Sequence, residues 1–227
     1  MDEREVARRL GISPGATLTS LVALAERTSP RCPWSAFKPL WLLLPWLESE
    51  KTAAHMRHGT PRNVAPFAET GGDLNHFGFL MDGALPTDER PIVYVEPKND
   101  DDATQIVAPN LRAFLGLVSV AFAEVVSRGA SDAEWFGFRR DWYGDDAARL
   151  AEMDRLSDLL CTIPGVTRPA SPSKIANAYP DQAFKLVFDD EEEEEPAPRP
   201  RNALWAAREA TDFAQRALEE RRYEEAA

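Results

Sequence analysis

The stretch FAETGGDLNHFGFL, residues 67–80, decides the fold, because two glycines and an aspartate interrupt an apolar, aromatic run there. Consecutive glycines permit positive φ, and an aspartate side chain can accept a hydrogen bond from the neighbouring backbone. Gly71, Gly72 and Asp73 therefore predict a structural turn, with positive φ at Gly71 or Gly72, that leads into a strand, HFGFLM, at 76–81. A phosphate-binding loop would need a different glycine spacing, a lysine and a strand-to-helix context.

A second strand is expected at 91–96, where PIVYVE is rich in β-branched and aromatic residues. The connecting loop at 81–90 contains Gly83 and Pro86. We therefore expect the two strands to pair in an antiparallel manner. The charged loop PKNDDDAT that follows is expected to be exposed, and AFKLVF at 183–188 could form one late strand.

Helices are expected on either side of these strands. Apolar residues at helical spacing predict a long helix from a first-turn proline, Pro109, to Gly129, and this helix should pack on the sheet. Ser131 and Glu134 form a capping-box pattern for the next helix, and a third is expected over 145–160. Earlier helices are expected at 3–10, ended by Gly11, and around Leu18, Leu21, Val22 and Ala25.

Composition limits the class of protein. The 227 residues, 44% of them hydrophobic, are enough for one generous domain with or without a tail. A net charge of -12 argues against binding to nucleic acid or anionic membranes. The charged N-terminus lacks a secretory pattern, and the most apolar run, at 39–47, is half the length needed to span a bilayer. Cys32 and Cys161 match neither a metal site nor a disulfide framework, so we expect a reduced, cytoplasmic setting.

The domain boundary is expected near residue 189. Seven acidic residues and a proline-rich spacer, DDEEEEEPAPRPR, occupy 189–201, and such a sequence repels itself and stays extended. We therefore predict a domain over 1–188, a linker over 189–201 and a C-terminal helix over 202–227. That helix is expected to dock back onto the domain or onto a partner.

Catalytic signals are weak. His55, His58, His76 and Asp73 could offer metal ligands, although the segment around His55 and His58 is equally typical of a solvated helix end. The sequence contains no GxSxG motif, and neither cysteine has a histidine nearby in sequence. We therefore expect a protein that is not an enzyme and uses no cofactor or metal, with a metal-dependent hydrolase as an alternative.

The segment SDAEWFGFRRDWYGDD, residues 131–146, is the candidate partner surface. A tight protein inhibitor presents aromatic anchors inside a charged rim, and an acidic rim suits a basic partner. Core packing is the alternative for the aromatic residues, and a solvated face is the alternative for the acidic ones. The tryptophan-rich segment at 34–46 is expected to pack against the core, with a partner groove as the alternative. The predicted contact residues are Trp135, Phe136, Trp142, Tyr143, Asp145, Asp146, Asp100, Asp101 and Asp102.

Four pieces of the chain, in order, resemble the second half of the SUKH superfamily pattern, a group of bacterial immunity proteins and fungal cell-wall assembly regulators. The pieces are Phe67–Asp73, Phe77–Leu80, Pro91–Val95 and Ile106–Leu115, within a family-like core of about 67–126. The resemblance implies an α+β fold, with a twisted, mostly antiparallel sheet flanked by helices. It also implies protein binding rather than catalysis, in many bacterial members to neutralise a toxin.

A regulatory or scaffold protein of the same fold is the alternative function. It would recruit another chain through the acidic linker and the C-terminal helix. The sequence leaves the identity of the partner and the oligomeric state open.

Overall fold

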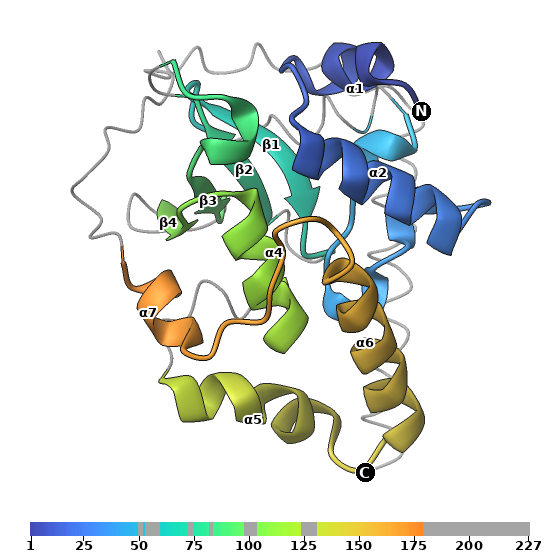
Figure 1. The fold of residues 1–227 in the computed structure, drawn as a ribbon, viewed down its shortest axis with the longest axis vertical. Coiled ribbons are helices and arrows are strands. Elements are labelled where there is room, and N and C mark those ends of the chain that lie inside the picture. The colour runs from blue at the N-terminus through green and yellow to red at the C-terminus, as the bar shows by residue number, and fades with distance from the viewer. Residues whose placement is uncertain are drawn as a thin grey trace, which may run out of the picture. The chain divides into compact units, whose positions relative to one another are not determined.

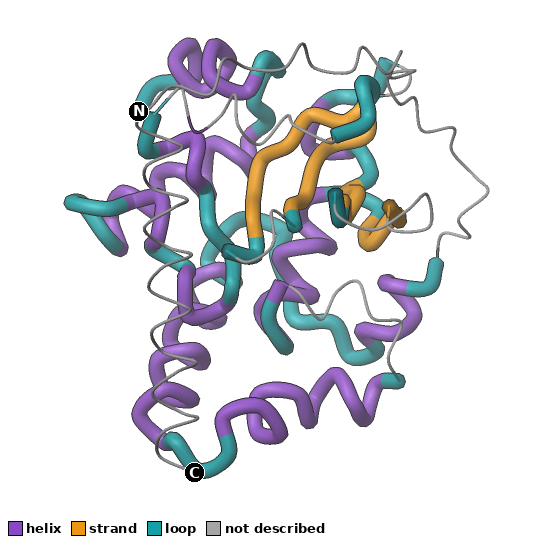
Figure 2. The backbone as a smooth tube through the Cα atoms, turned by 180° about the vertical axis from the view of Figure 1, so that it is seen from behind, coloured by secondary structure: helices purple, strands orange, loops and turns teal. Residues whose placement is uncertain are grey.

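A computed structural model of the chain gives an α+β fold, as the sequence predicted (Figures 1 and 2). It describes residues 1–49, 52, 60–71, 75–81, 84–97, 104–123 and 131–178. The strands are β1 (Val64–Glu69), β2 (His76–Leu80), β3 (Ile92–Val95) and β4 (Thr104–Ala108), paired antiparallel in the order β1-β2-β3-β4. No helix within the described ranges is long and apolar enough to cross a membrane.

The α-helices are α1 (Glu3–Leu10), α2 (Ala16–Thr28), α4 (Leu111–Val120), α5 (Asp132–Tyr143), α6 (Ala147–Leu160) and α7 (Pro172–Ala176). Short 3-10 turns are η1 (Pro33–Ser35), η2 (Lys38–Leu40), η3 (Pro45–Leu47) and η4 (Thr87–Glu89). Figure 1 shows α4 lying against the sheet, with α5 and α6 farther from the strands. The late strand expected at 183–188, the linker and the C-terminal helix lie outside the described residues.

The predicted turn before β2 is present. Gly71 has a φ of 87°, which confirms the expectation of positive φ at Gly71 or Gly72. The turn is closed by a backbone hydrogen bond of 3.0 Å from the Thr70 N–H to the Asn75 carbonyl. β2 then pairs with β3 in the predicted antiparallel manner. Gly72 and Asp73 lie outside the described residues.

Two strands were not expected from the sequence. β1, VAPFAE, contains Pro66, and its pairing with β2 shifts register between Pro66 and Ala68. Proline and alanine are poor strand formers, so β propensity gave little signal here. β4 was missed because Ile106 was assigned to the segment that opens the next helix. For β1, pairing with the neighbouring strand β2 overrides the weak local preference.

The sheet buries side chains on both faces. Phe77 and Phe79 alternate with smaller residues and pack in the main core, where the Phe77 ring lies 4.7 Å from that of Phe114 in α4. The other face carries a smaller cluster that includes Val64 and Val93. A Cβ at Gly78 would lie 2.3 Å from a methyl group of Val64, so β2 needs a glycine where β1 crosses closely.

The long helix predicted from Pro109 to Gly129 is shorter at both ends. Asn110 caps α4, its side chain accepting a 3.0 Å hydrogen bond from the Ala113 N–H, so Pro109 precedes the cap. The helix ends at Val120, and Gly129 lies outside the described residues. The sequence alone shows no reason for this early end.

Arg139 in α5 supplies the reason. Its Nε donates to the Ala121 carbonyl at 2.7 Å, and its Nη2 donates to the carbonyls of Ser119 at 2.9 Å and Val118 at 3.2 Å. A helix C-terminus leaves carbonyls without partners inside the helix, and here a buried guanidinium satisfies them. Burial lowers the pKa of Arg139 to about 10, so the group remains charged at neutral pH.

The predicted caps of the other helices are present. Ser131 and Glu134 form the capping box of α5, and Gly11 ends α1 with a φ of 73°. The helix expected over 145–160 begins at Ala147, with Asp146 as its N-cap. These signals are local, which is why the sequence reveals them.

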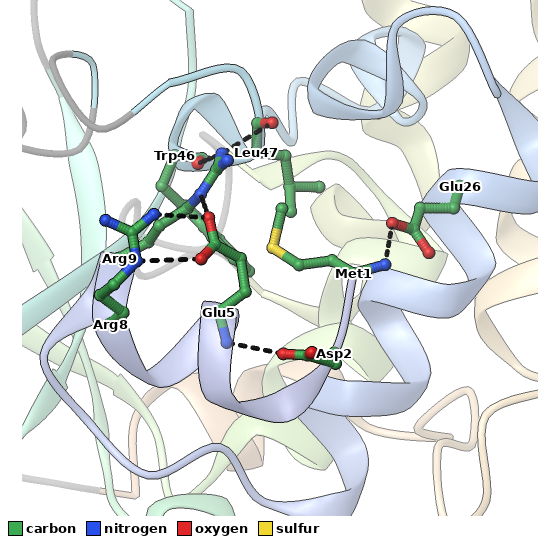
Figure 3. A network of polar contacts seen from close by, with 8 residues as sticks. All are labelled: Met1, Asp2, Glu5, Arg8, Arg9, Glu26, Trp46 and Leu47. Carbon is green, nitrogen blue, oxygen red and sulfur yellow. Dashed lines mark hydrogen bonds and ion pairs between the residues drawn. The ribbon is translucent and has the colours of Figure 1, made fainter.

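A polar network holds α1 against η3 (Figure 3). Glu5 accepts hydrogen bonds from Arg8 and Arg9, and these lower the pKa of its carboxyl group to about 2. Arg9 also donates to the backbone carbonyls of Trp46 and Leu47, at 2.9 and 3.1 Å. Figure 3 shows that this network ties the first helix to a segment that is far along the chain, which is a structural role.

Candidate functional site

The tryptophan-rich segment at 34–46 lies beside the Gly71 turn. Leu43 pairs with Glu69 at the end of β1 through two backbone hydrogen bonds, of 2.9 and 3.0 Å. Trp46 is fully buried, and its indole N–H donates to the Phe67 carbonyl at 2.6 Å. Core packing is therefore correct for Trp46. Trp34 and Trp41 remain partly exposed.

Trp41 is held in an unusual conformation. Its φ is 54°, the only positive φ among the described residues other than glycine. The indole N–H donates to the Tyr143 hydroxyl at 2.8 Å. The ring also packs on Phe122, at 5.0 Å between centroids, and edge to face on Trp142, at 5.4 Å. Left-handed backbone in a bulky residue is uncommon and persists where surrounding contacts determine it, as these contacts do.

A pocket opens beside this indole. Its volume is ≈ 480 Å³, within the range of small-ligand sites. The lining combines aromatic, aliphatic, cationic and turn residues. We call it the Trp41 pocket and define it by Trp34, Lys38, Pro39, Trp41, Leu43, Thr70, Gly71 and Arg149. The Gly71 turn, which the sequence assigned to the backbone alone, thus also forms part of a pocket wall.

Two cations line the Trp41 pocket. The Arg149 guanidinium lies 4.4 Å from the centre of the Tyr143 ring, a cation–π contact that orients it. Lys38 is exposed on η2. Within the part of the chain that the structure describes, neither side chain forms an ion pair. The pocket is therefore a cationic, aromatic site in a chain of net charge -12.

The predicted contact residues of α5 separate into a core group and a surface group. Trp135 is fully buried, so it anchors the helix and presents nothing to a partner. Phe136 and Trp142 are 56% and 52% exposed. Tyr143 is half-buried and packs against Phe122. Asp145 and Asp146 are exposed next to the end of α5, whereas Asp100, Asp101 and Asp102 lie outside the described residues.

Sequence reasoning missed the role of the pocket cations. Lys38 and Arg149 belong to no motif, and they are separated by more than a hundred positions. The sequence signal that was available is the spacing of tryptophans in WSAFKPLW, residues 34–41, for which a partner groove was one alternative. The tertiary structure adds Arg149 and the turn to that segment.

The metal hypothesis stays a prediction. His76 is buried in β2, with its Nε2 2.7 Å from the Thr60 hydroxyl. His55, His58 and Asp73 lie outside the described residues. Among the residues that are described, no three histidine, cysteine or acidic side chains gather as a metal site would require.

No family model matches this sequence, and no curated protein matches it. Any argument for function therefore depends on the fold and on the surface described above.

Proposed function

We propose that this chain is a protein-binding module and that α5 carries the partner surface. The observation that carries the proposal is the exposure of two large aromatic side chains, Phe136 and Trp142, on one helix. Aromatic residues that pack into a partner commonly dominate the binding energy of an interface. Exposed apolar side chains favour aggregation, and a partner that covers them explains why they lie on the surface.

The helix that bears them is anchored to the core at several points. Trp135 lies in the core, and the buried Arg139 donates hydrogen bonds both to the end of α4 and to Ser157 in α6. The capping box fixes the first turn. A rigid surface loses little conformational entropy on binding, which favours tight association.

Exposed charged side chains in and next to α5 are mostly acidic, with Arg140 as an exposed cation among them. Glu134, Asp141, Asp145 and Asp146 are all exposed in or next to α5. A rim of this charge would speed encounter with a basic partner and reject acidic ones. Together with the resemblance to the SUKH superfamily, this supports an immunity protein that neutralises a toxin domain by direct binding.

The test first captures partner proteins and then measures the binding of each purified partner to this chain. The full chain is used to isolate partners from its native cells, and each captured protein is identified, expressed and measured for binding. Phe136→Ser and Trp142→Ser should each weaken binding by roughly tenfold or more, as expected for aromatic anchors. Leu85→Ser is the matched control, because Leu85 is 49% exposed and lies outside α5.

Unchanged affinity in both α5 variants, with folding verified by thermal unfolding, would remove α5 as the partner surface. Toxin neutralisation makes a further demand. The partner should arrest growth when expressed alone, and co-expression of this chain should restore growth. A partner that is harmless alone would instead favour the regulatory or scaffold alternative.

A further inference from the structure

We propose that the Trp41 pocket binds a small organic monoanion, a carboxylate attached to a flat apolar body. The pocket adjoins the α5 partner surface, because Trp41 contacts Trp142 and Tyr143 of α5, but the proposal does not rest on partner binding. The inference comes from three features: the apolar walls, the two cations, and the charge of the whole chain.

The apolar lining of the Trp41 pocket favours a ligand with a flat apolar group. Trp34 and Trp41 offer indole surfaces, and Pro39 and Leu43 complete an apolar lining. Aromatic faces favour stacked or edge-to-face contact with a second ring. Trp41 is already fixed by Tyr143 and Phe122, so a ligand meets a wall that needs no further ordering.

The two cations of the Trp41 pocket favour a negatively charged ligand. Lys38 and Arg149 both line the Trp41 pocket, and neither has an ion-pair partner among the described residues. A guanidinium can bind both oxygens of a carboxylate, and such charge-assisted hydrogen bonds are stronger than neutral ones. The contact with Tyr143 holds the Arg149 guanidinium in place before a ligand arrives. A cationic ligand of the same shape would be repelled.

The net charge of the chain disfavours polyanions over a ligand with one negative charge. At -12, the chain repels polyanions such as nucleic acids at distances where its charges act together. Screening confines this repulsion to about 8 Å at physiological salt, whereas the two pocket cations act at contact distance. One carboxylate can therefore be attracted locally by Lys38 and Arg149 despite the overall negative charge.

Two sources share this chemistry. One is a free aromatic or arylalkyl acid, and the other is the C-terminal aromatic residue of a peptide, which also places a carboxylate next to a ring. The experiment can distinguish them because the second source adds a peptide bond to the same group.

The test uses three probes with the same ring and different charge: phenylacetate, phenylacetamide and phenethylammonium. The full chain is labelled with nitrogen-15, and the indole N–H signals of Trp34 and Trp41, assigned with Trp34→Phe and Trp41→Phe, are followed during titration. Phenylacetate should shift both signals. The amide should bind roughly tenfold more weakly, the loss expected for one charge-assisted hydrogen bond at a partly exposed site, and the ammonium more weakly still.

Arg149→Gln should reduce the preference for the acid over the amide, and the double variant Lys38→Gln/Arg149→Gln should abolish it. Arg155→Gln is the matched control, because Arg155 lies in the same helix outside the pocket lining and should retain the preference. N-acetylphenylalanine binding at least tenfold more tightly than phenylacetate would assign the pocket to a peptide C-terminus, and the reverse would assign it to free acids. Equal affinities for the three probes, no shift with phenylacetate, or an unchanged preference in Arg149→Gln would each overturn the proposal.

Discussion

Replacing Arg139 by alanine should strongly destabilise the fold. The guanidinium donates to the carbonyls of Val118, Ser119 and Ala121, and its Nη2 also donates to the Ser157 hydroxyl at 2.6 Å. Alanine would leave these acceptors without their donor in a buried region. An unsatisfied buried polar group costs about 1–3 kcal/mol, and here three backbone carbonyls lose a donor.

We therefore expect Arg139→Ala to lower the free energy of unfolding by roughly 3 kcal/mol, because several buried carbonyls lose their donor together. This is a large share of the ~5–15 kcal/mol typical of a native protein. The ion pair with Asp154 contributes little to this value, because the Asp154 side chain is 71% exposed. Arg139→Lys should give an intermediate loss, since an ammonium lacks the planar fork of donors.

Urea unfolding followed by tryptophan fluorescence measures the effect. Arg140→Ala is the matched control, because Arg140 is the exposed neighbour in the same helix, and it should change the free energy by no more than about 0.5 kcal/mol. Asp154→Ala should cost less than about 1 kcal/mol. A loss below about 1 kcal/mol in Arg139→Ala, or equal losses in Arg139→Ala and Arg140→Ala, would refute the role assigned to the buried guanidinium.

Three further predictions concern backbone and charge. Gly15→Ala should lower the free energy of unfolding by about 1–2 kcal/mol. A Cβ at residue 15 would lie 2.3 Å from the Asp88 carboxylate, which accepts a hydrogen bond from the Thr17 N–H at the start of α2. An unchanged urea midpoint would contradict this expectation. Gly71→Ala should also lower the free energy of unfolding by about 1–2 kcal/mol, because the φ of residue 71 is 87°. The added Cβ would also lie 2.8 Å from a Leu43 methyl group. A variant that is more stable in thermal unfolding would contradict this description of the turn. Glu5 has a lowered pKa of about 2 against an ordinary 4.5, so its contribution to stability is present above pH 4.5 and is lost as pH falls toward 2. The difference in urea midpoint between wild type and Glu5→Gln should therefore shrink across that interval, and a constant difference would contradict the proposed ion pairs.

Local signals in the sequence predicted the elements whose causes are local. The capping box of Ser131 and Glu134, the end of α1 at Gly11 and the positive φ of Gly71 each depend on residues a few positions apart. The pairing of β2 with β3 followed from two strong strands on either side of one loop. The groups that interact in these features are close together in the sequence, so the sequence predicts them.

The sequence could not predict features whose causes are distant. α4 ends at Val120 because Arg139, from another helix, satisfies its last carbonyls. Trp135 and Trp142 are seven positions apart in one helix, yet the first is fully buried and the second is half exposed. Both would satisfy the same apolar pattern, and their difference depends on where the core ends beneath α5.

The candidate sites divide in the same way. Sequence alone indicated an acidic chain, strands and helices, an aromatic segment at 131–146 and a glycine turn, because composition and short spacings encode these directly. The lining of one pocket by Trp41, Gly71 and Arg149 became visible only in the folded chain. Their proximity depends on the pairing of Leu43 with Glu69 and on the contact of Tyr143 with Trp41, and contacts between residues this far apart leave no periodic pattern in the sequence.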